Sequence, residues 1–139
     1  MRLHIVARGK IGRSPEAELV ERYLNRISWP TTLTELPERG ATPAAVQNSV
    51  TIVLDERGES LSSTALARKL EAWRDGGKRE ARFLIGAADG HSAKERSAAD
   101  LLLSFGPATW PHLLVRAMLA EQLFRAVSIL ANHPYHREG

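Results

Sequence analysis

Apolar runs alternate along the chain with polar and glycine-containing breaks, and this pattern predicts strands separated by helices. Short apolar runs predict strands at Leu3–Ala7, Val50–Leu54, Arg82–Ile85 and Leu101–Phe105, and the alternating stretch Thr31–Leu36 predicts a further strand. The run Val50–Leu54 is strongly apolar, as expected for a strand that is buried on both faces. The pattern therefore predicts an α/β fold with a mostly parallel sheet flanked by helices.

Capping residues and glycines mark the helices between these strands. Ser14 and Pro15 predict a helix start, because serine caps free N–H groups and proline fits the first turn. Trp29-Pro30 predicts the end of that helix. Further helices are predicted from the Ser60–Ser63 caps to Gly76, around Ala93–Asp100, and from Pro111 to Ala131. The stretch Pro37–Asn48 is predicted to be a loop, and Asp55–Glu59 a polar turn.

The predicted final helix has a very narrow polar side. Glu121, Arg125, Ser128 and Asn132 form one stripe, and nearly every other position in its second half is apolar. A helix with so little polar surface buries more than one face. Either one face covers the sheet while another contacts a second copy, or the helix lies at the centre of the monomer. We expect the first arrangement, a homodimer.

Composition narrows the class of protein. With 139 residues, of which 43% are hydrophobic and 25% charged, residues 1–139 are expected to form a single domain. The lack of cysteine and the scattered histidines argue against a metal site. No signal-peptide pattern or membrane-length apolar run is visible, so we expect a cytoplasmic protein without membrane contact. The net charge of +3 and the pI near 9.7 weakly favour a polyanionic partner.

Three predicted strand ends carry residues that suit a ligand site. They are Leu54, Gly86 and the loop Phe105–Trp110. Glycine lets a ligand approach the backbone closely, and ligands of open α/β sheets bind beyond the carboxyl ends of the strands. The chain has neither a G-x-G-x-x-G fingerprint nor a G-x-x-x-x-G-K-[ST] phosphate loop. These ends are therefore expected to converge on a pocket of another kind.

The C-terminal third of the chain carries a family resemblance. Leu84-Ile85-Gly86, the loop before Pro111-His112, the segment Glu121–Ala126 and the ending His133–Arg137 resemble the RlmH-type SPOUT methyltransferases. The resemblance extends over the full length of the chain. It implies a SPOUT α/β-knot fold with a deep trefoil knot, and a homodimer. It also implies methyl transfer from S-adenosylmethionine to N3 of pseudouridine 1915 in helix 69 of 23S ribosomal RNA, on the assembled 70S ribosome.

The resemblance further implies which residues bind the cofactor. They are Leu54, Gly86, Phe105, Gly106, Pro107, Ala108, Thr109 and Trp110. Backbone groups would hold the adenine edge, and Leu54, Phe105 and Trp110 would supply apolar surface. Trp110 can equally be an ordinary core residue. The family commonly has glycine and proline where this chain has Ala87 and Ala88, which alters the turn after Gly86.

The C-terminal residues are expected to supply the chemistry. N3–H of a pyrimidine is a weak acid, so methyl transfer to it requires a base and an in-line arrangement. His136 titrates near working pH and is the expected base, and Tyr135 stacks on or hydrogen-bonds the target base. Arg125 or Arg137 holds a phosphate or a developing oxyanion. A frayed terminus is the alternative. The tail can serve the pocket of its own subunit or that of the partner.

Two other functions are compatible with the same residues. A non-catalytic ribosome- or RNA-binding module would use the basic loop with Arg8, Lys10 and Arg13 but would not bind S-adenosylmethionine. A SPOUT methyltransferase with another substrate would bind the cofactor but would not methylate ribosomes.

Overall fold

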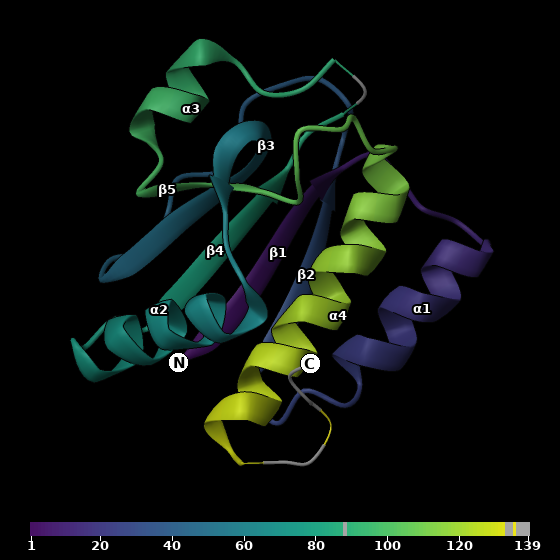
Figure 1. The fold of residues 1–139 in the computed structure, drawn as a ribbon. Helices are drawn as coiled ribbons and strands as arrows, with labels where there is room; N and C mark the ends of the chain where they lie inside the picture. The colour runs from purple at the N-terminus through teal and green to yellow at the C-terminus, as the bar shows by residue number, and fades with distance from the viewer. Residues whose placement is uncertain (88, 133–134, 136–139) are drawn as a thin grey trace.

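A single sheet organises the fold (Figure 1). The computed structural model describes residues 1–87, 89–132 and 135. Within them five strands pair in the order β2-β1-β4-β3-β5, and each neighbouring pair is parallel. The strands are β1 (Arg2–Arg8), β2 (Thr31–Leu36), β3 (Ser49–Ser60), β4 (Glu80–Ile85) and β5 (Leu101–Ser104). The helices are α1 (Pro15–Leu24), α2 (Ser63–Asp75), α3 (Ala93–Ala98) and α4 (His112–Leu130). The predicted α/β class with a parallel sheet is confirmed.

Local chemistry accounts for the helix ends. The Ser14 hydroxyl accepts a hydrogen bond from the Ala17 N–H at the start of α1, and Ser62 caps α2 in the same way. The predicted end of the first helix at Trp29-Pro30 is wrong, because α1 ends at Leu24. Beyond it the backbone tightens into a turn in which the Ile27 N–H donates to the Leu24 carbonyl over 3.3 Å. This turn still buries Ile27, which explains the apolar spacing beyond the helix.

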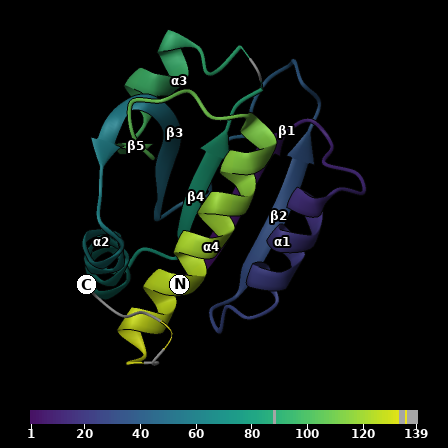
Figure 2. The ribbon, with the colours of Figure 1, turned by 45° about the vertical axis from the view of Figure 1, so that its right-hand side comes forward.

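The helices α1, α4 and α2 form one layer on one face of the sheet, with α4 in the middle (Figure 2). The core between them joins strand residues such as Ile5 and Phe83 to Leu119 and Leu123 of α4. The opposite face carries a smaller apolar cluster around Val53, which packs against Ala99 just after α3. The sheet is thus buried on both faces near its centre.

The 37–48 loop is held to the other elements by hydrogen bonds. The Arg8 guanidinium donates to the carbonyls of Pro37 at 3.0 Å and Gly40 at 2.8 Å. The Thr42 hydroxyl donates to the Glu95 carboxylate at 2.8 Å, which links the loop to α3. The predicted loop is confirmed. Arg8, which the sequence offers as an RNA contact, serves this loop.

Strand β3 is longer than predicted. Asp55–Glu59 does not form a polar turn, because the strand continues to Ser60 and pairs with β5 in two registers. Leu103 is paired with Leu54 and again with Glu59. Between the two pairings the chain passes over the backbone of β5 so closely that a Cβ on Gly58 would lie 2.5 Å from the carbonyl carbon of Leu102. Gly58 permits this close approach because it has no side chain. The polar residues on either side of it therefore belong to the strand and not to a turn.

The position of α4 explains most of its apolar character. It lies on the sheet with α1 and α2 on either side, so several of its faces are covered within one chain. Even Arg116 is fully buried, with its guanidinium on the Glu35 carboxylate and on the carbonyl of Gly9 at 3.1 Å. Leu114 and Met118 remain half-buried beside an open groove. Within one chain α4 therefore lies between α1 and α2 on the sheet, and the expected contact with a second copy stays a prediction.

Two further features concern the class of protein. None of the helices described here is long and apolar enough to cross a membrane. In the same described residues, no group of three or more His, Asp or Glu side chains is placed to hold a metal ion.

Because Gly58 packs closely against β5, replacing it with alanine is predicted to destabilise the protein. A strain-free glycine-to-alanine change stabilises a protein by about 0.4–1 kcal/mol. Gly58→Ala, in contrast, places its Cβ against β5 and should lower the free energy of unfolding by about 1–3 kcal/mol, the usual cost of overpacking. Urea denaturation measures this, with Arg57→Ala, the exposed neighbour, as the control within about 0.5 kcal/mol of wild type. A Gly58→Ala protein as stable as wild type would contradict the described crossing.

Candidate active site

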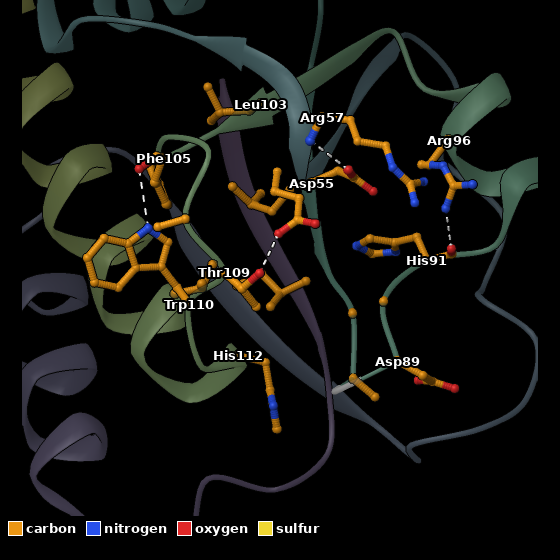
Figure 3. A pocket seen from close by; sticks show the side chains of 18 of the residues that line it. Asp55, Arg57, Asp89, His91, Arg96, Leu103, Phe105, Thr109, Trp110 and His112 are labelled. Carbon is orange, nitrogen blue, oxygen red and sulfur yellow. Dashed lines mark hydrogen bonds between the residues drawn. The ribbon is translucent and has the colours of Figure 1, made fainter.

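The segment Leu54–Arg57 of β3 and the carboxyl ends of β4 and β5 surround a cavity of about 250 Å³ (Figure 3). Its floor is apolar and consists of Leu54, Ile85 and Leu103. The turn after Gly86 forms one wall, and the 105–110 loop forms the other. All the residues predicted to bind the cofactor line this cavity except Pro107. The structure thus brings together three segments that are far apart in the sequence. β4 and β5 contribute their carboxyl ends, as the rule for parallel sheets predicted, whereas β3 contributes residues from its middle.

Side-chain hydrogen bonds fix the 105–110 loop. The buried Ser104 hydroxyl donates to the Gly106 carbonyl at 2.8 Å and accepts from the Gly106 N–H at 3.0 Å. Gly106 has φ = 109°, a conformation that glycine adopts without strain. The Thr109 hydroxyl donates to the Glu56 carboxylate at 2.8 Å, so the crossing segment of β3 holds this loop in place (Figure 3). Trp110 is 42% exposed and is therefore no core residue.

The opposite wall is a tight turn. The Gly90 N–H donates to the Ala87 carbonyl at 2.9 Å, and Gly90 has φ = 78°. A Cβ on Gly86 would lie 3.0 Å from the carbonyl carbon of Gly90, so a larger residue here would have to displace the turn slightly. Ala87 is compatible with the turn although the family commonly has glycine there. Ala88 lies outside the described residues.

His91 enters the cavity wall, and sequence reasoning missed it. Its side chain is only 5% exposed, its Nδ1 is 3.9 Å from the Glu95 carboxylate, and its Nε2 forms no hydrogen bond. Burial lowers the pKa of His91, although the carboxylates of Glu95 and Asp55 and the carbonyls of Leu54 and Leu84 oppose this. The imidazole is therefore neutral at pH 7. The only sequence signal was a histidine directly after the Gly90 turn.

Charged residues at the rim also escaped the sequence analysis. Asp55, Glu56 and Asp89 line the cavity together with Arg57 and Arg96. Arg96 is held by a 2.6 Å hydrogen bond from its guanidinium to the His91 carbonyl. The acidic residues add carboxylates to the cavity lining. Among the described residues, however, no group of three or more His, Asp or Glu side chains is placed to hold a metal ion. The sequence did carry a signal for these rim residues, because Asp55–Arg57 directly follows the apolar run Val50–Leu54.

Two of the residues predicted to be catalytic, Arg125 of α4 and Tyr135, meet at the Glu121 carboxylate. The Arg125 guanidinium donates to the Glu121 carboxylate through Nε at 2.9 Å, and the Tyr135 hydroxyl donates to the same carboxylate at 3.0 Å. The bond to Glu121 raises the pKa of Arg125. Burial, with bonds to Tyr23 and Glu121, raises the pKa of Tyr135 to about 12. Tyr135 is therefore protonated at neutral pH. The predicted base His136 lies outside the described residues, as do His133, Pro134 and Arg137.

Within one chain this cluster and the cavity are apart. His112 lines the cavity at the first turn of α4, and Glu121 follows nine residues later. Nine residues of α-helix advance about 14 Å and complete about two and a half turns, so the two side chains point to opposite sides of α4. Sequence reasoning predicted both sets of residues and left their relative position open.

Comparison with known proteins shows which family this chain resembles. The model of a family described as predicted SPOUT methyltransferase matches residues 1–136. Proteins named ribosomal RNA large subunit methyltransferase H from Erythrobacter litoralis, Rhizorhabdus wittichii and Zymomonas mobilis are 66%, 65% and 58% identical, over 100% of this chain and 100% of each relative. The structure of a probable methylase family protein from Haemophilus influenzae has a TM-score of 0.59 at 13% identity and covers 99% of this chain and 70% of that chain.

The fold and the family match together define the class. An all-parallel α/β sheet carries a cavity at the carboxyl ends of its strands, and the family model spans nearly the whole chain. The chain belongs to the SPOUT methyltransferase family, as the resemblance implied. The Haemophilus structure supports the fold alone.

The lowered pKa of His91 predicts how stability depends on pH. Because the folded state binds the proton less readily than the unfolded state, stability falls as pH drops below the unfolded pKa of about 6.5. The slope for one proton is at most about 1.4 kcal/mol per pH unit. Urea denaturation of wild type and His91→Gln between pH 7.5 and 5 measures this. The difference in stability between the two should shrink toward pH 5 or reverse, whereas a constant difference would contradict the neutral buried imidazole.

Proposed function

We propose that this protein is an S-adenosylmethionine-dependent methyltransferase that modifies N3 of a pseudouridine in the large-subunit ribosomal RNA. The observation that carries the proposal is the coincidence of two findings. The relatives named ribosomal RNA large subunit methyltransferase H match the chain over its full length. The predicted cofactor positions, Pro107 apart, meet in one cavity. We also propose that residues 1–139 act as one catalytic domain, in the cytoplasm.

The cavity suits S-adenosylmethionine in its shape and its chemistry. The apolar floor of Leu54, Ile85 and Leu103 matches an adenine ring, and the glycine-containing walls present backbone groups to its edge. Asp55, Glu56 and Asp89 supply negative charge near a sulfonium cation. The neutral His91 adds no positive charge, and the three carboxylates outnumber the two guanidinium groups of Arg57 and Arg96 in the same lining. When bound there, S-adenosylmethionine supplies an electrophilic methyl group.

The chain's own residues then have distinct tasks. The Glu121 carboxylate orients Arg125 and Tyr135 by the bonds that it accepts from both. Arg125 stays charged and is placed to hold a phosphate or a developing oxyanion. Tyr135, with its raised pKa, serves as a hydrogen-bond donor rather than a base. We therefore assign the removal of the N3 proton to His136, as expected from its ordinary titration range.

The separation along α4 favours a site built from two chains. Glu121 lies about 14 Å along the helix from His112 of the cavity and on the opposite side of it. The groove beside Leu114 and Met118 has Gly106 of the cofactor loop and Glu121 in its lining. A second copy related by a two-fold axis and seated in this groove would bring its tail to the cavity end. We propose such a homodimer, in which each tail serves the partner's pocket.

We propose that the substrate is the RNA within the assembled ribosome. The relatives' printed names specify ribosomal RNA of the large subunit. The resemblance adds the assembled 70S ribosome and pseudouridine 1915 of 23S RNA. The net charge of +3 is compatible with a polyanionic partner and is too small to identify one.

Removal of residues 133–139 should separate cofactor binding from chemistry. Calorimetry with S-adenosylmethionine should give an affinity within about twofold of wild type, because the described cavity includes no residue after Val115. Methyl incorporation into 70S ribosomes should fall about a hundred- to ten-thousandfold, the usual range for a lost general base. The matched control removes only residues 138–139 and should retain activity.

The same two measurements distinguish the rival functions. A wild-type protein that fails to bind S-adenosylmethionine would support the non-catalytic binding module. A protein that binds the cofactor but leaves 70S ribosomes unmethylated would support another substrate. A truncated protein with full activity would show that the tail is not part of the active site.

A further inference from the structure

The proposed reaction constrains how the target base is held. The role that we infer for the Trp110 side chain rests on that proposed function. N3 lies on the edge of the pyrimidine ring, so the methyl group and the proton acceptor must both approach in the plane of the ring. The two faces of the base are then the surfaces left for the protein to grip. Proteins that act on unpaired bases commonly hold them by stacking aromatic side chains on these faces.

Tyr135 is poorly placed for this task in the described structure. Its ring packs on Phe124 with the centroids 4.5 Å apart, and the Arg125 guanidinium lies 4.9 Å from the centroid of the Tyr135 ring. Its hydroxyl is bonded to Glu121. Stacking on a base would break contacts that the chain already makes. Tyr135 is therefore assigned to the Glu121 cluster, and the stacking surface must come from elsewhere.

Trp110 is the large aromatic side chain that stays exposed beside the cavity in the described structure. Among the described residues the exposed large apolar side chains are Val46 and Trp110, and only Trp110 lines the cavity. Leaving so large an apolar surface in water is unfavourable, so an exposed aromatic ring beside a cavity indicates a binding surface. Figure 3 shows the Trp110 indole at the edge of the cavity, next to Phe105 and Thr109.

The indole is also held in one orientation. Its Nε1–H donates to the Phe105 carbonyl at 3.3 Å, which orients the edge of the ring while its faces stay free of that bond (Figure 3). Trp110 is followed by Pro111, the N-cap of α4, which restricts the backbone at this position. A stacking surface that is ordered before binding loses little conformational entropy when the base arrives.

We propose that Trp110 is the platform on which the target base stacks at the mouth of the cavity. One face of the unpaired pyrimidine rests on the exposed face of the indole, with its N3 edge turned toward the cavity. The inner edge of Trp110 still lines the cofactor cavity, so the residue separates the two ligands and contacts both. The partner recognised here is an unstacked RNA base, and recognition by stacking alone is tolerant of base identity.

Three variants test this residue. Trp110→Leu keeps an apolar side chain without a π face, Trp110→Phe keeps a smaller aromatic ring, and Val46→Ala is the matched control at the other exposed apolar position. For each, calorimetry gives the dissociation constant of S-adenosylmethionine, and methyl incorporation into 70S ribosomes gives kcat/KM. Because base stacking contributes substantially to binding, Trp110→Leu should lower kcat/KM about tenfold or more, and it should lower cofactor affinity by a clearly smaller factor.

The conservative variant distinguishes stacking from a structural role. Trp110→Phe should retain kcat/KM within about threefold of wild type, and Val46→Ala should equal wild type. If Trp110→Leu and Trp110→Phe have the same kcat/KM, the platform is refuted. It is also refuted if cofactor affinity falls as much as kcat/KM, because Trp110 would then serve the cofactor only. A wild-type protein that binds S-adenosylmethionine but does not methylate ribosomes would refute the proposed function itself, and the platform with it.

Discussion

The length and direction of α4 are the constraint on which the proposed two-chain site depends. The helix begins at the cavity with His112 and reaches Glu121 only after two and a half turns, on its other side. The first turn of α4, which lines the cavity, and Glu121 are therefore held about 14 Å apart along the helix by a rigid element. No loop movement at either end shortens a helix that is buried between α1, α2 and the sheet. A site that uses both ends is most simply completed by a second chain.

The cavity depends in turn on the passage of β3 over β5. The close approach at Gly58 carries Asp55 and Glu56 to the rim, and Glu56 then holds the 105–110 loop through Thr109. The neutral His91 and the tight Gly90 turn complete the opposite wall. The walls consist of short segments, and each is fixed by one or two hydrogen bonds. Small changes at glycines in this region should therefore affect the ligand site more than equal changes in the central sheet.

Local signals in the sequence were sufficient for the elements and for part of the site. Ser14, Ser62 and Gly76 mark helix ends because caps act within one turn, and the parallel strand ends predict where Leu54 and Gly86 meet Phe105–Trp110. The continuation of β3 was missed because its polar residues resemble a turn, and its partner β5 lies more than forty residues away. His91 was missed because burial, which lowers its pKa, is a property of the fold. The exposure of Trp110 and the separation along α4 likewise required the structure.

The most direct test of the two-chain site is complementation between two inactive variants. Gly106→Val forces a branched side chain into a left-handed conformation and should disable the cofactor pocket, while removal of residues 133–139 disables the tail. Each variant alone should be inactive on 70S ribosomes. After the two are mixed, unfolded and refolded together at equal amounts, half of the dimers should be mixed and each should contain one complete site, which restores about a quarter of wild-type activity. If the mixture stays inactive although mixed dimers are present, each tail serves its own subunit and the two-chain site is wrong.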